Sequence, residues 1–255
     1  MKNLIAVFVL LLIFTSCEKV EDDTGNFCTS NCTTLRGKFV SLNDQPVPNI
    51  RVALKYRISG GELGGGYTRK IVNTKSDKNG NFNNFFFIKD SELGRYTGGY
   101  FEVDIDDSNL DNNKYIRTNN LIGNTTSDIG FAIYSIINRD TIIDETYYIP
   151  KKAYIKVNLN NYAAQKEGDR FEVRTYYPFG PKVGQNTFLN SEYATGFSGY
   201  DNWTAKTLNN SFKVFVAEGE KNIIHIIKLK NGVLLNQDIE VFVPANNTIE
   251  LTYDY

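Results

Sequence analysis

The chain has 255 residues, of which 41% are hydrophobic and 13% aromatic, and this composition is sufficient for one large core or two small ones. Its 28 Lys and Arg residues nearly balance 29 Asp and Glu residues, which leaves a formal charge of −1. A chain with so little net charge has no broad basic field, so nucleic acid is excluded as the expected partner.

Residues 1–16 are predicted to be a secretory signal peptide. Lys2 supplies a positive charge, and an unbroken apolar run follows from Leu4 to Phe14. The run is too short to span a bilayer, but it matches the apolar region of a signal peptide. Thr15-Ser16-Cys17 then resembles the lipobox of bacterial lipoproteins, which implies cleavage before Cys17 and lipid attachment to its thiol. The alternative is an ordinary secreted protein whose signal contains an incidental cysteine.

A lipidated Cys17 would hold the chain on a membrane by its acyl chains. Each buried methylene contributes about 0.8 kcal/mol, so two or three chains of palmitate type anchor a protein stably where one does not. The run Glu18–Asp23 resembles the lysine-plus-acidic signal that takes Bacteroidota lipoproteins to the outer face of the outer membrane. A solvated acidic linker would have the same composition. We therefore expect a lipid-anchored outer-membrane protein that faces the cell exterior.

Two further cysteines, Cys28 and Cys32, lie in the expected acidic tether, residues 17–32. Outside the cytoplasm, a pair this close in sequence most simply forms a local disulfide. A zinc site would need two more ligands, and no other histidine or cysteine follows nearby. We expect no cofactor.

Apolar and polar residues alternate with a period of two along most of the remaining chain, and no stretch keeps helical spacing for long. In Arg51–Ile58, every second residue from Val52 would share one buried face. Asn79-Gly80 and Asn231-Gly232 supply the positive φ values of tight hairpins. Further strands are predicted over Phe101–Ile105, Phe171–Arg174, Ile239–Val243 and Ile249–Tyr253. The pattern predicts an all-β protein made of antiparallel, immunoglobulin-like β-sandwiches.

A domain boundary is expected at Ile149–Lys152. Pro150 cannot donate to a strand ladder, and a new alternating strand opens at Tyr154. The resulting halves, 33–149 and 150–255, are each close to the usual size of one sandwich, about 100 residues. A single larger sandwich is the alternative.

Residues 33–90 contain three features in a characteristic order. A glycine-bearing strand, Leu35–Val40, precedes a proline turn and strand, Gln45–Leu54, and a hairpin follows with Thr74, Asp77 and Asn79–Phe82. In this order they resemble the carboxypeptidase regulatory-like, or transthyretin-like, domain common in Bacteroidota surface proteins. Proline fixes φ at the turn, and Asn-Gly closes the hairpin. The resemblance implies a β-sandwich that serves as a non-catalytic accessory or spacer.

Few residues support enzymatic chemistry. His225 is the single histidine and lies among isoleucines, so neither zinc hydrolysis nor Ser-His or Cys-His catalysis is expected. Two carboxylates at the right separation could still hydrolyse a glycoside. The acidic run from 104 to 111 is a candidate calcium site or, alternatively, a solvated loop. Its ligands would be Asp104, Asp106, Asp107 and Asp111. We predict no catalytic residue.

Aromatic residues set among Gly, Pro, Ser and Asn mark the segment from 176 to 203. They do not alternate as buried strand residues would, which suggests loops, where binding groups often lie. Flat rings stack on sugar faces while Asn and Asp bond the hydroxyls; the alternative is that the rings pack the ends of the sandwich. The candidate ligand-stacking residues are Tyr176, Tyr177, Phe179, Tyr193, Phe197, Tyr200 and Trp203.

These observations favour a non-enzymatic binding, adhesion or accessory module of the cell surface, with the membrane, a glycan or other surface proteins as partners. The alternatives are a structural spacer or assembly component with no ligand of its own and, third, a glycan-active hydrolase. Exposed coplanar rings would favour binding and buried rings a spacer. A cleft with two facing carboxylates would favour hydrolysis.

Overall fold

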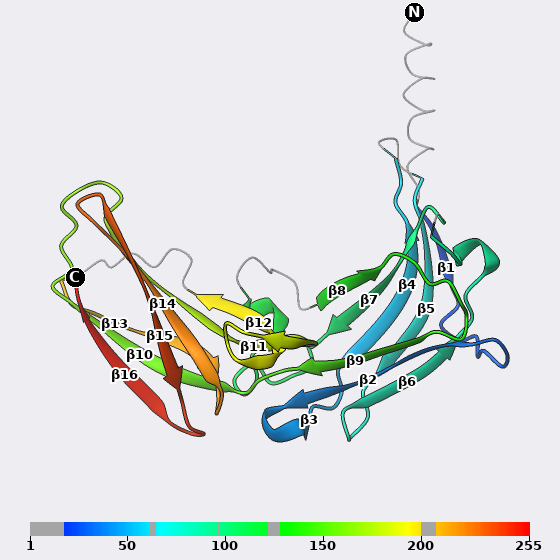
Figure 1. The fold of residues 1–255 in the computed structure, drawn as a ribbon, viewed down its shortest axis with the longest axis horizontal. Coiled ribbons are helices and arrows are strands. Elements are labelled where there is room, and N and C mark those ends of the chain that lie inside the picture. Colours follow the sequence, from blue (N-terminus) through cyan, green and yellow to red (C-terminus); the bar gives the residue numbers. More distant parts are fainter. Residues whose placement is uncertain (1–17, 62–64, 96, 122–127, 200–207) are drawn as a thin grey trace, which may run out of the picture.

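The computed structural model describes residues 18–61, 65–95, 97–121, 128–199 and 208–255. These residues form β-strands and short 3-10 helices, which confirms the predicted all-β class (Figure 1). None of the helices among them is long and apolar enough to cross a membrane. The predicted signal peptide, Cys17, Tyr200 and Trp203 lie outside the described residues.

The N-lobe, the described part of residues 18–149, is a sandwich of two sheets. One sheet has the order β1-β5-β4-β7-β8, and the other contains β6, β2, β3 and β9. Leu35, Phe39, Leu54 and Phe101 are fully buried in its core. The bounds are β1 (Lys19–Asp22), β2 (Thr33–Ser41), β3 (Gln45–Pro46), β4 (Arg51–Ile58), β5 (Tyr67–Lys75), β6 (Asn81–Phe86), β7 (Tyr100–Asp106), β8 (Asp128–Ile133) and β9 (Ile142–Tyr148), with 3-10 helices at Leu42–Asp44, Asp90–Glu92 and Thr118–Asn120.

The C-lobe, the described part of residues 150–255, packs a sheet of order β13-β10-β16 against β11, β14 and β15. Ile155, Val173, Val216 and Ile224 form the centre of a second hydrophobic cluster there. The bounds are β10 (Lys152–Asn160), β11 (Arg170–Asn186), β12 (Ser191–Gly199), β13 (Asn210–Ala217), β14 (Lys221–Lys230), β15 (Val233–Phe242) and β16 (Thr248–Asp254).

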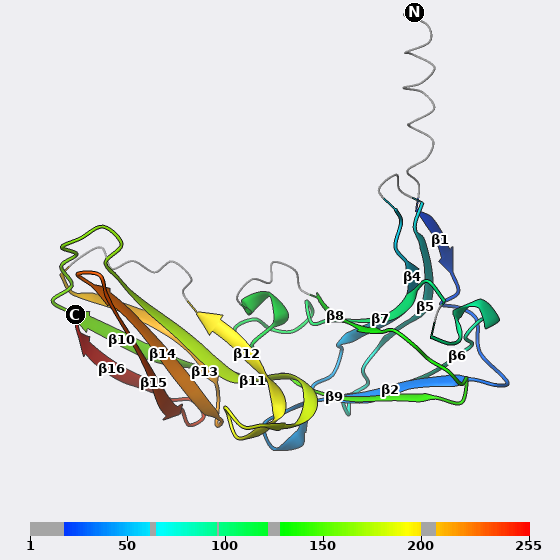
Figure 2. The same cartoon turned by 45° about the horizontal axis from the view of Figure 1, so that its top comes forward.

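One sheet runs through both lobes. Its order is β15-β14-β11-β9-β2-β3, and β11 leaves the C-lobe to pair with β9 of the N-lobe through Gly180 and Pro181. Figures 1 and 2 show β11 and β12 between the lobes in both views. This sheet contains strands from both sides of Pro150. The division into domains of 33–149 and 150–255 therefore stays a prediction.

The strands with clear alternation form as predicted. In β4, Val52, Leu54 and Tyr56 are buried while Arg51 is exposed, but Ile58, predicted on the buried face, is exposed at the end of the strand. The segment expected to be looped from 176 to 199, however, is largely β11 and β12. Alternation is lost there because β11 has register shifts after Pro178 and a positive φ of 103° at Gly180, where it bends from one partner strand to the next.

Three strand pairs depart from the expected antiparallel pattern. β1 pairs with β5, β2 with β9, and β10 with β16 in parallel. In the pairs β2–β9 and β10–β16 the two strands lie about 100 positions apart in sequence. No hairpin joins the two strands of either pair, because the chain forms other strands between them. A tight turn therefore does not force these pairs to be antiparallel.

Candidate functional site

The lobe joint, where β11 meets β9, buries part of the aromatic segment that the sequence singles out. Tyr177 is 0% and Phe179 3% exposed. The Phe179 ring lies edge-on to Tyr147 at 5.9 Å between centroids, and Tyr147 in turn contacts Phe39 of the N-lobe core. Both rings therefore belong to the N-lobe hydrophobic cluster although they follow the predicted boundary.

Gly196 of β12 lets the two strands close over these rings. A Cβ at this position would lie 2.5 Å from the Tyr177 ring and 2.6 Å from the Phe179 Cβ. Glycine is therefore needed here for close approach rather than for an unusual φ.

A second set of contacts closes the joint on its outer side. The Tyr148 ring stacks on Tyr193 with 4.6 Å between centroids, and its hydroxyl donates a hydrogen bond to the Glu220 carboxylate. Burial raises the pKa of Glu220, although the bond from Tyr148 opposes that rise. Burial and the neighbouring Glu220 also raise the pKa of Tyr148.

Backbone hydrogen bonds tie the same region together. The Ile116 N–H of the N-lobe donates to the Pro150 carbonyl at 2.9 Å, and the Lys152 N–H of the C-lobe donates to the Lys114 carbonyl at 2.8 Å. The residues at the predicted boundary are thus hydrogen-bonded across it, and the lobes are joined by a sheet, an aromatic cluster and backbone hydrogen bonds.

Two further rings of the candidate set, Tyr176 and Phe197, lie on the outer face of β11 and β12. Tyr176 is partly exposed and contacts Phe197 and Phe188, with ring centroids 4.8 and 5.3 Å apart. Phe188, which is 44% exposed, was not predicted from the sequence because it lies outside the Gly- and Pro-rich runs. His225 faces the same cluster and shares a hydrogen bond of 2.6 Å with Asp238.

The acidic segment after Cys17 is not a free linker. Residues 19–22 form β1, which adds to the edge of β5 in parallel register. Arg69 of β5 is nearly buried and binds both Glu92 and Asp23, with 3.0 Å between its Nη1 and the Asp23 carboxylate. Burial alone would lower the pKa of Arg69, but its hydrogen bonds with Glu92 and Asp23 outweigh that effect and raise it.

The ion pairs and hydrogen bonds of Asp23 and Glu21 with Arg69, Lys89 and Tyr67 form what we call the N-terminal clamp, and Glu21 makes its second contact. It accepts hydrogen bonds from Lys89 and from the Tyr67 hydroxyl. These bonds lower the pKa of Glu21 from 4.5 to about 2, the one from Lys89 contributing most. Two acidic residues of the predicted linker or export signal, Glu21 and Asp23, therefore have basic partners on the N-lobe.

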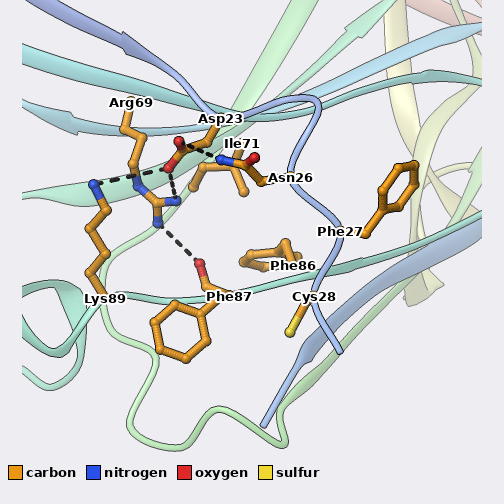
Figure 3. A pocket seen from close by; sticks show the side chains of 9 residues that line it. All are labelled: Asp23, Asn26, Phe27, Cys28, Arg69, Ile71, Phe86, Phe87 and Lys89. Atoms are coloured by element: carbon orange, nitrogen blue, oxygen red, sulfur yellow. Dashed lines mark hydrogen bonds and ion pairs between the residues drawn. The ribbon is translucent and has the colours of Figure 1, made fainter. Parts of the chain in front are cut away.

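A cavity of about 190 Å³ lies beneath the clamp. Figure 3 shows Arg69, Asp23 and Lys89 on one side of it and Phe86, Phe87 and Cys28 on the other. The structure joins Cys28 to Cys32 in a disulfide. The charged groups that line the cavity form ion pairs with one another, with Glu21 or with Glu92. These groups are therefore already used by the ion pairs of the clamp.

The four candidate calcium ligands are not brought together. Asp104 pairs with Lys55 at 2.7 Å, whereas Asp107 is buried and accepts hydrogen bonds from Thr118. Asp106 and Asp111 accept backbone N–H bonds within their own turns. Among the described residues, no group of three or more His, Cys, Asp or Glu side chains is placed to hold a metal ion.

Comparisons with known proteins give no family. No family model matches the chain, and no curated protein matches it. Among solved structures, it is similar to the Bacillus anthracis TIE protein at 15% identity, with 88% of this chain and 34% of that chain covered and a TM-score of 0.28.

Two pilins show likenesses of the same order. For the streptococcal ancillary pilin the identity is 12%, with 89% of this chain and 63% of that chain covered and a TM-score of 0.27. For the shaft pilin spaA from Lactobacillus rhamnosus GG the identity is 8%, with 88% and 97% covered and a TM-score of 0.28. The chain thus spans about a third of the TIE protein and somewhat under two thirds of the ancillary pilin.

Proposed function

We propose that this chain is a non-enzymatic structural module of the cell surface, a rigid two-lobed arm with no ligand of its own. The observation that carries the proposal is the burial of Tyr177 and Phe179 in the lobe joint. A ring with no exposed face cannot stack on a sugar, and these rings contribute instead to a core shared by the two lobes. The spacer alternative therefore accounts for the aromatic segment better than ligand binding does.

The N-terminal clamp supports the same proposal. If Cys17 carries the lipid, only Glu18 separates it from β1, and β1 is fixed to β5 and to Arg69. We propose that the chain is anchored through Cys17 at the outer membrane, facing outward, and that the clamp orients the N-lobe against that membrane. The lobe joint then fixes where the C-lobe lies.

In this proposal, the N-lobe corresponds to the carboxypeptidase regulatory-like spacer that residues 33–90 resemble, and the C-lobe to a second sandwich. Gly37 supports the glycine-bearing strand of that resemblance. A Cβ there would lie 2.0 Å from the Glu145 carbonyl oxygen and 2.6 Å from the Phe82 ring, so β2 needs glycine to pack between its neighbours.

The proposal is tested with the full lipidated chain in vesicles. A donor dye on Asn231→Cys, at the tip of the β14–β15 hairpin, reports energy transfer to acceptors on the lipid headgroups. A rigid arm gives one narrow distribution of transfer efficiency. Tyr148→Ala, which removes the Tyr193 stack and the Glu220 hydrogen bond, should broaden it. The proposal would be contradicted if the distribution of transfer efficiency were as broad in the chain with Tyr148 intact as in the Tyr148→Ala variant.

A second candidate, glycan binding, rests on the half-exposed cluster of Tyr176, Phe188 and Phe197. Its test is a glycan array with Tyr176→Ala, and Phe87→Ala as a control at an exposed ring on the N-lobe. Saturable binding that Tyr176→Ala abolishes and Phe87→Ala retains would favour this function over a spacer without a ligand.

A further inference from the structure

β15 is a long edge strand with an unusual surface. Among the described residues it pairs only with β14, along its whole length and without a register shift. Val233, Leu234, Leu235 and Phe242 are each 54 to 59% exposed, and the first three are consecutive. A run of exposed apolar residues on a free edge presents unpaired backbone groups beside surface that water solvates poorly.

The usual protections against edge pairing are missing from this strand. Proteins commonly blunt edges with Lys, Pro or a β-bulge. β15 contains no Lys, Arg or Pro, and its ladder to β14 has no bulge. Its two acids are already paired within the hairpin, because Asp238 bonds His225 and Glu240 bonds Lys221 at 2.7 Å. The strand is therefore open to an added strand on its free side.

The turn fixes which backbone groups face that side. Asn231 and Gly232 both have positive φ, at 55° and 81°, as in a two-residue hairpin that closes on the hydrogen-bonded pair Lys230 and Val233. Hydrogen bonding alternates along an antiparallel pair. Even-numbered residues of β15, from Leu234 to Phe242, therefore direct their N–H and C=O groups away from β14.

We infer that β15 is an interface with a second copy of this chain, in which the two β15 strands pair antiparallel about a two-fold axis at Gln237. In such a pair, side chains on the same face lie opposite one another. Val233 then meets Val241 of the second copy, Leu235 meets Ile239 of the second copy, and Gln237 meets itself. The even-numbered residues 234, 236, 238 and 240 supply the hydrogen-bonded pairs.

Charge selects this register over its neighbours. An axis at Asp238 would set two carboxylates opposite each other, and an axis at Ile239 would set Asp238 against Glu240 of the second copy; like charges directly opposite destabilise a sheet. An axis at Asn236 would put Leu235 opposite a glutamine. The Gln237 register alone among these four combines apolar pairs on one face with no opposed charges. The inference goes beyond the proposed arm, since an arm can act as a monomer.

Cross-linking of the full chain in the oxidising cell envelope tests this interface. At the two-fold axis Gln237 forms a non-hydrogen-bonded pair, whose Cα atoms lie about 4.5 Å apart, within the range that a disulfide requires. Gln237→Cys should therefore give a reducible species of twice the monomer mass. Asn236→Cys is the matched control, because two residues of offset along the strands place its Cα atoms roughly 8 Å apart.

A second variant tests the apolar contacts. In the Gln237→Cys background, Leu235→Lys should lower the cross-linked fraction by about tenfold or more, because it sets a lysine against Ile239 of the second copy. Phe85→Lys, at an equally exposed residue on β6, should leave the fraction unchanged. Absence of the Gln237→Cys cross-link, or equal cross-linking through Asn236→Cys, overturns the inference and leaves the arm proposal standing.

Discussion

Two adjacent tyrosines at the end of β9 are buried to similar extents but differ in their hydrogen bonding. The Tyr148 hydroxyl bonds Glu220, whereas the Tyr147 hydroxyl has no partner among the described residues. Burial raises the pKa of Tyr147, so this group stays neutral and its desolvation is not offset. Their contributions to stability should therefore have opposite signs.

We expect Tyr147→Phe to raise the free energy of unfolding by about 1 kcal/mol, because it removes a buried hydroxyl without a partner. Tyr148→Phe should lower it by about 1 to 3 kcal/mol, because it leaves the Glu220 carboxylate without its donor. Urea unfolding followed by circular dichroism measures both. An equal decrease in the free energy of unfolding in both variants would show that the Tyr147 hydroxyl has a hydrogen-bond partner.

Two arginines form ion pairs that differ in burial. Arg69 and Glu92 are 3% and 2% exposed, whereas Arg36 and Asp144 are 50% and 52% exposed. Arg69→Met should lower the free energy of unfolding by about 3 to 5 kcal/mol, since it leaves the Glu92 carboxylate buried without its ion-pair partner. Arg36→Met should lower the free energy of unfolding by less than about 1 kcal/mol. Similar losses, measured by the same unfolding experiment, would be inconsistent with a buried ion pair.

Among the elements, the sequence predicts the strands that bury one face and misses those that bury two. Alternation marks β4 and β7 because solvent covers their other face. The start of β11 is predicted over Phe171–Arg174, but the rest of the strand carries no such signal, since Tyr177, Pro178 and Phe179 are all buried and the bend falls at Gly180. The joint was not predicted for this reason, and the clamp was not predicted because Arg69 and Lys89 lie far from β1 in sequence.

The clamp element has a pH dependence set by Glu21. Its pKa is lowered from 4.5 to about 2 in the folded chain. Ionised Glu21 therefore favours attachment of β1 fully above pH 4.5, and this contribution is lost as the pH falls through about 2. Backbone amide chemical shifts of Lys19–Asp22 should keep strand values down to about pH 4 and change below it.

Glu21→Gln provides the control for this titration, because its amide does not ionise. Its β1 amide shifts should lose the transition between pH 4 and 2 while those of β4 stay the same. A wild-type transition centred near 4.5 would mean that Lys89 and Tyr67 do not hold the carboxylate in solution.

In the whole molecule, the proposed function requires the two lobes to move as one body. Two hydrophobic clusters alone would allow independent domains, but the shared sheet, the buried rings of the joint and the backbone hydrogen bonds of Pro150 and Lys152 to the N-lobe oppose hinge motion. In the proposed function, the joint transmits the orientation set by the clamp to the C-lobe. Its rigidity is the property that an anchored spacer requires.

The most direct measurement is the distance distribution between spin labels on Lys78→Cys, in the β5–β6 turn, and Ala245→Cys, in the β15–β16 turn. Both residues are exposed and belong to different lobes. The account predicts one narrow distribution that Tyr148→Ala broadens. A broad or multimodal distribution in the chain with an intact joint would contradict it.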